Sequence, residues 1–155
     1  MATFTAVHVL ISLIGIVAGF VVITGFLTNN SMRRATQAFL AFTVATSVTG
    51  FGFPFPPILP AHVVGALSLV LLGAALYALY GRGLSGGWRT TYVVTAVMSQ
   101  YFNVFVLIVQ LFRRVPALTA LAPTQSEPPF AIAQAIALVA FIAIGVLSVK
   151  RFKPH

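Results

Sequence analysis

Two histidines and one carboxylate are the side chains of this sequence best suited to chemistry. His8 and His62 lie near the start of separate apolar runs, and Glu127, the only acidic residue, precedes the last run. Two imidazoles facing each other can ligate haem iron from opposite sides. Two imidazoles with one carboxylate instead suit zinc, copper or non-haem iron. His8, His62 and Glu127 are therefore candidate ligands of a metal or a haem.

The composition excludes several other kinds of site. The chain has no cysteine, so thiolate metal sites and thiol catalysis are absent. A single acidic residue cannot form the carboxylate pair that glycosidases and two-metal enzymes use. No glycine-rich phosphate-binding string occurs either. We assign no catalytic residue, and the sequence favours a role other than catalysis.

The apolar content predicts an all-α polytopic membrane protein. Hydrophobic residues make up 59% of the chain and charged residues 6%, and the mean hydropathy is +1.04. Apolar runs of the ~20 residues that cross a bilayer recur along the sequence. We expect a single transmembrane domain, residues 1–155, that forms a bundle of five transmembrane helices. Their predicted spans are about 4–27, 35–51, 61–80, 90–112 and 130–149.

The net charge of +8 is better explained by membrane topology than by nucleic acid, because the basic residues lie at the ends of the apolar runs. Cytoplasmic loops of membrane proteins carry an excess of lysine and arginine. With a cytoplasmic C-terminus, that side collects Arg33, Arg34, Arg82, Arg89 and three basic tail residues, and only Arg113 and Arg114 lie outside. The sequence therefore predicts an N-out, C-in topology and no nucleic-acid partner.

This topology brings polar residues from distant parts of the sequence to one leaflet. His8 and His62 would lie at similar depth near the outer surface, with Gln110 at the outer end of the fourth span and Glu127 in the outer loop. We expect His8, His62, Gln110 and Asn103 to line a cofactor or ligand site. The alternative is that both histidines only hydrogen-bond to loop carbonyls.

Small and polar residues mark the helix faces that should point into the bundle. Gly15 and Gly19 form a G-x-x-x-G pair that favours close packing within the chain. The fourth span carries a polar face, and its amides need partners inside the bundle. That face comprises Thr95, Ser99, Asn103 and Gln110, with Gln100 directed elsewhere, toward another helix or subunit.

Residues 52–60 form a loop of phenylalanine, glycine and proline between the second and third spans. Its prolines cannot continue a helix, and its aromatic rings suit the membrane interface. The loop is either an ordinary interfacial turn or a lid over a hydrophobic ligand such as a quinone or a haem edge.

Three functions are compatible with these features. The leading one is a small membrane protein that binds a cofactor, a metal or a hydrophobic ligand through His8 and His62 near the outer leaflet. The second is an accessory subunit that packs against other membrane proteins in a larger complex. The third is an oligomeric transporter or channel, although the span interiors carry no charged residue.

The strings ATSVTGFGFPF, ILPAH, YFNVFVL and LAPTQSEPPF resemble a family of small, uncharacterised bacterial inner-membrane proteins, over most of the chain. The resemblance implies a location in the bacterial inner membrane and no particular activity. The DoxX-like group of four-helix membrane proteins is similar in size and helical character only. Five spans and the proline-rich loop depart from it, so no residue role is transferred.

Overall fold

The computed structural model describes residues 1–54 and 60–154, and all regular structure within these ranges is helical. The helices are α1 (Ala2–Thr28), α2 (Arg33–Gly50), α3 (Pro60–Leu76), the π-helix η1 (Tyr77–Gly81), α4 (Trp88–Arg114), α5 (Pro116–Leu121) and α6 (Pro128–Arg151). The prediction of an all-α chain is confirmed. The short helix α5 was not predicted, although Pro116 at its first turn is a favoured way to begin a helix.

Four helical segments are long and apolar enough to cross a membrane, as expected for a polytopic membrane protein. They are Ala2–Thr28, His62–Gly81, Trp88–Arg114 and Pro128–Arg151. Helix α2 has 18 residues, but two arginines, one glutamine and several hydroxyl side chains lower its hydropathy. The described residues thus contain four candidate spans, and the predicted count of five is not confirmed.

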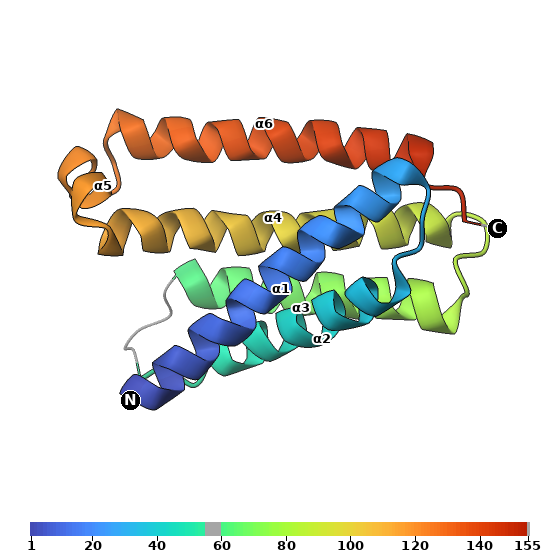
Figure 1. The fold of residues 1–155 in the computed structure, drawn as a ribbon, viewed down its shortest axis with the longest axis horizontal. Coiled ribbons are helices and arrows are strands. Elements are labelled where there is room, and N and C mark those ends of the chain that lie inside the picture. The colour runs from blue at the N-terminus through green and yellow to red at the C-terminus, as the bar shows by residue number, and fades with distance from the viewer. Residues whose placement is uncertain (55–59, 155) are drawn as a thin grey trace.

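The long helices lie roughly side by side, and successive helices run in opposite directions (Figure 1). Helices α1 and α2 form one closely packed hairpin, and α3 with η1 packs against both α2 and α4. Helix α4 contacts α1, α3, α5 and α6, so it is the central helix of the bundle. Side chains on α4 consequently determine much of the interior.

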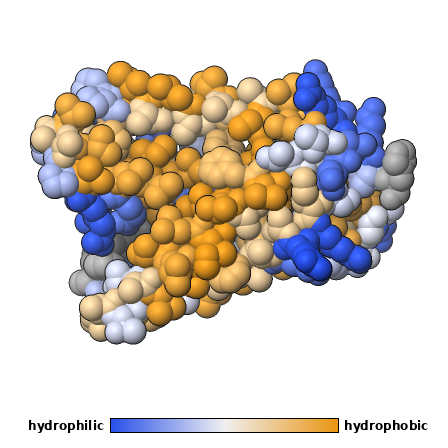
Figure 2. All heavy atoms as spheres, in the orientation of Figure 1, coloured by the Kyte–Doolittle hydropathy of each residue, from blue (hydrophilic) through white to orange (hydrophobic). Residues whose placement is uncertain are grey.

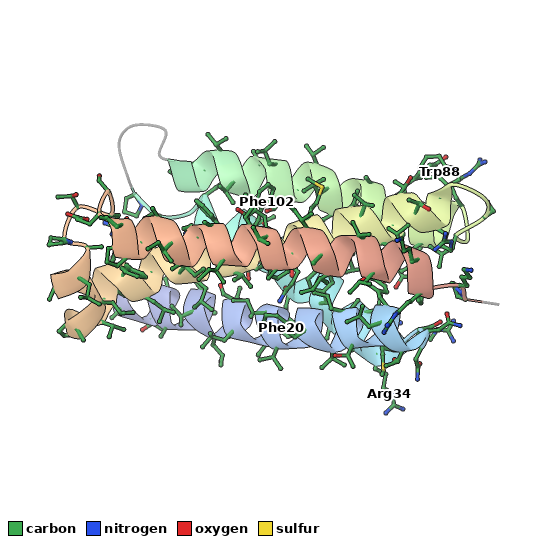
Figure 3. All side chains as sticks on the ribbon, turned by 90° about the horizontal axis from the view of Figure 1, so that it is seen from above. Phe20, Arg34, Trp88 and Phe102 are labelled. Carbon is green, nitrogen blue, oxygen red and sulfur yellow. The ribbon has the colours of Figure 1, made fainter. Side chains whose placement is uncertain are left out.

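One end of the bundle is tied together by hydrogen bonds to the C-terminal residues. Arg89, in the first turn of α4, donates from Nη1 to the carbonyls of Val149 and Phe152. The backbone N–H of Lys153 donates to Asn29 Oδ1 in the α1–α2 turn, at 2.7 Å. Hydrophilic residues gather at this end and apolar residues cover the middle (Figure 2). Figure 3 shows Arg34 and Trp88 at this same end.

The interior holds a hydrogen-bonded pair of amides on α4. Gln100 is fully buried, and its Nε2 donates to the carbonyl of Ile16 on α1 at 2.8 Å. Asn103 Nδ2 donates to Gln100 Oε1 and to Thr43 Oγ1 on α2, both at 3.3 Å. Each amide thus finds partners inside the bundle, as a polar group in hydrocarbon requires. This cluster joins α1, α2 and α4.

Gly15 and Gly19 make room for these contacts, which confirms that the glycine pair serves packing within the chain. A Cβ on Gly15 would lie 3.3 Å from Thr43 Oγ1 on α2. A Cβ on Gly19 would collide with the amide group of Gln100. Close approach of α1 to its neighbours therefore depends on having no side chain at these positions.

Replacing Gly19 tests the packing around Gln100. Gly19→Ala should destabilise the bundle by about 1–3 kcal/mol, because the methyl group displaces the amide and leaves buried polar atoms unpaired. Gly73→Ala on α3 is the matched control. No described atom lies within 4 Å of its Cβ position, so it should be neutral or slightly stabilising. Thermal unfolding in detergent, followed by circular dichroism, measures the difference, and equal melting temperatures would contradict this account.

Candidate functional site

Helix α2 holds the His8 imidazole through Thr49. His8 Nδ1 lies 2.8 Å from Thr49 Oγ1, and this oxygen also lies 2.7 Å from the carbonyl of Ala45. A carbonyl can only accept, so the single hydroxyl proton of Thr49 is donated to Ala45 and Nδ1 donates its proton to Thr49. The neutral imidazole then carries its free lone pair on Nε2. His8 is thereby oriented as a ligand or hydrogen-bond acceptor.

Aromatic rings and a glycine surround this imidazole. Phe53 packs edge-on against His8 with ring centroids 5.0 Å apart, and Phe4 packs edge-on against Phe53 at the same distance. His8 Cε1, the atom next to Nε2, lies 3.8 Å from the position that a Gly50 Cβ would occupy. Gly50 thus lies at van der Waals distance from this edge of the ring. The surroundings are apolar and suit a hydrophobic group.

An unsatisfied hydroxyl lies on the same helix interface. Thr46 lies between Thr43 and Gly50 on the α2 face that contacts α1. Its Oγ1 is buried, and no described atom hydrogen-bonds to it. A buried polar atom without a partner costs free energy unless something occupies the space beside it. The α1–α2 interface near His8 therefore has an unused polar group.

His62 contacts the other side of the turn that ends α2. Its ring stacks on Phe51, with centroids 5.6 Å apart and planes 28° apart. Phe51 also approaches Gly65, one turn further along α3, where a Cβ would lie 3.4 Å from the Phe51 ring. The two histidines thus flank one turn, His8 against Gly50 and His62 against Phe51. Their binding of a shared ligand stays a prediction, and residues 55–59 of the predicted lid lie outside the described residues.

Asn103 and Gln110 lie at different depths along α4, and each has hydrogen-bond partners within the protein. Asn103 belongs to the interior cluster with Thr43 and Gln100. Gln110 lies seven residues further along, roughly 10 Å along the helix axis. Its Oε1 accepts from Arg114 Nε at 3.2 Å, an i,i+4 contact. The structure gives both amides structural partners, and their contact with a ligand stays a prediction.

Glu127 closes the loop before α6. Its Oε1 accepts from Thr124 Oγ1 at 2.8 Å and from the Thr124 N–H at 3.2 Å, and its Oε2 accepts from the Ser126 N–H at 3.1 Å. Glu127 is the N-cap residue of α6 by position, but its side chain makes no capping hydrogen bond. The carboxylate instead stabilises residues 124–127.

Metal binding by His8, His62 and Glu127 together stays a prediction. Within residues 1–54 and 60–154, no group of three or more histidine, aspartate or glutamate side chains is placed to hold a metal ion. The Glu127 carboxylate is already engaged with its own loop. The residue that sequence analysis missed is Thr49. Its contact with His8 joins positions 41 residues apart, and no local pattern reveals such a pairing.

The hydrogen bonds in this loop should lower the pKa of Glu127, the only acidic side chain. Partial desolvation of Glu127 would raise the pKa, but the hydrogen bonds from Thr124 and Ser126 outweigh it and hold the pKa below the ordinary value of 4.5. This loop stabilisation is therefore present at neutral pH and is lost as the pH falls through the lowered pKa. A ¹³C NMR titration of the carboxyl group should give a midpoint below 4.5. Thr124→Val should raise the midpoint, whereas Thr90→Val, far from the loop, should not. A midpoint unchanged by Thr124→Val would contradict the assignment.

Comparison with known proteins assigns no family to this arrangement of residues. No protein-family model, no curated protein and no solved structure matches the chain.

Proposed function

We propose that this chain is a small membrane-embedded binding protein that holds a cofactor, a metal or a hydrophobic ligand at the end of the bundle where α1 begins. His8 is the principal ligand and His62 the second. The observation that carries the proposal is the hydrogen bond from His8 Nδ1 to Thr49, which leaves Nε2 with a free lone pair. Metal-binding histidines are commonly held in this way through their other nitrogen.

The chemistry of Nε2 favours some occupants over others. An unprotonated imidazole nitrogen can ligate haem iron or a transition-metal ion, or accept a hydrogen bond from a hydroxyl group. It cannot donate a hydrogen bond to a quinone carbonyl. The edge-on rings of Phe4 and Phe53 suit a flat apolar group near His8. Haem or another metal centre is therefore the leading occupant.

An optical spectrum tests this function directly. The protein, purified in detergent from cells supplied with haem and iron, should show a haem absorption band. His8→Ala should abolish the band, whereas His155→Ala, which removes the third histidine, should leave it intact. A featureless spectrum with no bound transition metal by elemental analysis would overturn the metal-centre proposal.

Substitutions of Thr49 provide a second test of the proposed metal centre. Thr49→Val removes the acceptor for His8 Nδ1, and loss of such an orienting hydrogen bond lowers metal affinity about 10–100-fold. Thr49→Ser keeps the hydroxyl and should retain most of the affinity. Equal affinity in both variants would show that Thr49 does not orient the ligand.

We further propose that α2 crosses the membrane as a fifth span, with an N-out, C-in topology in a bacterial inner membrane. Helix α2 lies alongside α1 over most of its length (Figure 1). Hydrogen bonds hold the α1–α2 turn, the start of α4 and the C-terminal residues at one end. That end carries most of the basic residues, which supports its placement in the cytoplasm.

The absence of cysteine makes this topology testable with single introduced cysteines. With five spans, a membrane-impermeant maleimide applied to spheroplasts should label Ser126→Cys and leave Ser31→Cys and Ser85→Cys unlabelled. All three variants should react in detergent, which is the control. If α2 does not cross, Ser31→Cys and Ser85→Cys lie on opposite sides and only one of them is protected. Labelling of Ser31→Cys and Ser85→Cys, with Ser126→Cys protected, would show that the orientation is the opposite, N-in.

A further inference from the structure

An open groove runs between α2 and the α3–η1 segment, away from the histidines. Its volume is about 340 Å³, and it is lined by Gln37, Leu40, Ala41, Val44, Leu76 and Tyr80. Leu76 and Tyr80 form one wall, where η1 continues α3 with the backbone N–H of Arg82 bonded to the carbonyl of Tyr77 at 2.9 Å. Such π-helical turns are often found at functional sites.

The groove changes from polar to apolar along its length. Gln37 and Tyr80 lie nearest the end of the bundle where α2 begins, and Val44 and Leu76 lie further toward its middle. The Gln37 amide and the Tyr80 hydroxyl can both hydrogen-bond to a headgroup. The aliphatic side chains that follow offer a surface for a hydrocarbon chain. This polarity matches that of a lipid molecule in one leaflet.

A cation completes the polar end of the groove. Arg33 precedes Gln37 by four residues and Ala41 by eight, so it lies on the same face of α2 and its side chain is exposed. Arg34 projects away from the bundle, as Figure 3 shows. The only acidic side chain, that of Glu127, precedes α6 at the opposite end of the bundle, so no acidic side chain lies near Arg33. An anion from outside the chain would complement this charge.

We propose that the groove is a binding site for one anionic phospholipid. The phosphate lies against Arg33, Gln37 and Tyr80, and one acyl chain follows Leu40, Val44 and Leu76. Arginine binds phosphate through paired N–H donors, and basic pockets between membrane helices bind acidic headgroups. The site is separate from the one around His8, and its existence does not depend on a metal or haem there.

Native mass spectrometry with defined lipids tests the site. The protein in detergent is titrated with phosphatidylglycerol or phosphatidylcholine of identical acyl chains, and one phosphatidylglycerol should bind more tightly than phosphatidylcholine. Arg33→Gln should weaken phosphatidylglycerol binding about fivefold, the typical contribution of one basic residue near an anionic lipid surface. Arg113→Gln, at the other end of the bundle, is the matched control and should leave this affinity unchanged.

A second variant tests the acyl-chain part of the groove. Ala41 is exposed and lines the groove, so Ala41→Phe should fill the groove without disturbing the core, and it should reduce binding of both lipids. Ala143→Phe, at an exposed position on α6, is its control. Equal binding of the two lipids, with no effect of Arg33→Gln, would overturn the proposal. The proposal would also be overturned if inorganic phosphate displaced phosphatidylglycerol and Ala41→Phe bound both lipids as tightly as the wild-type protein. That result would indicate a simple anion contact.

Discussion

The fold depends on satisfying the Gln100 amide, in an interior whose other buried polar side chains, among the described residues, are serine and threonine hydroxyls. A primary amide in hydrocarbon must find partners for both its oxygen and its nitrogen. Gln100 does so through the Ile16 carbonyl and Asn103, and only a glycine at position 19 leaves space for it. The distance between α1 and α4 is therefore fixed by the Gln100 amide and by the absence of a side chain at Gly19. Apolar packing alone would not distinguish this arrangement from neighbouring ones, because lipid tails are as apolar as leucine.

The same spacing positions the candidate site. Asn103 extends the amide pair to Thr43 on α2, and Gly15 allows α2 to approach α1 beside it. Two helical turns further along this interface, His8 meets Thr49. The interior cluster and the histidine thus lie on one continuous helix contact. Asn103, which was predicted to contact a ligand, thus takes part in holding together the helices that carry His8 and Thr49.

The sequence predicted the helices well because their apolar runs are long and separated by proline, glycine or basic residues. When η1 is counted with α3, the ends of the five long helices lie within two residues of the predicted runs. Prediction from the sequence fails where contacts join residues that are far apart along the chain. The spacing of polar residues placed Gln100 off the polar face of α4 but did not predict its contact with Gly19, and it gave no role to Thr49. In helix α2, the exposed Arg33, Arg34 and Gln37 and several hydroxyl side chains lower the hydropathy by which candidate spans are recognised, so its crossing of the membrane stays a proposal.

Hydrogen bonds join the C-terminal residues to the start of α4 and to the α1–α2 turn, and this has a consequence for biogenesis. Residues 149–153 comprise the end of α6 and the two residues after it, so they leave the ribosome after the other long helices. Their carbonyls nevertheless accept hydrogen bonds from Arg89 in α4, and the Lys153 N–H donates to Asn29 after α1. The earlier helices can insert one after another, but this end of the bundle closes only when the last helix arrives. Until then the Arg89 guanidinium lacks its carbonyl partners at the membrane surface. Assembly of the bundle is therefore completed as a late step, when translation of α6 is finished.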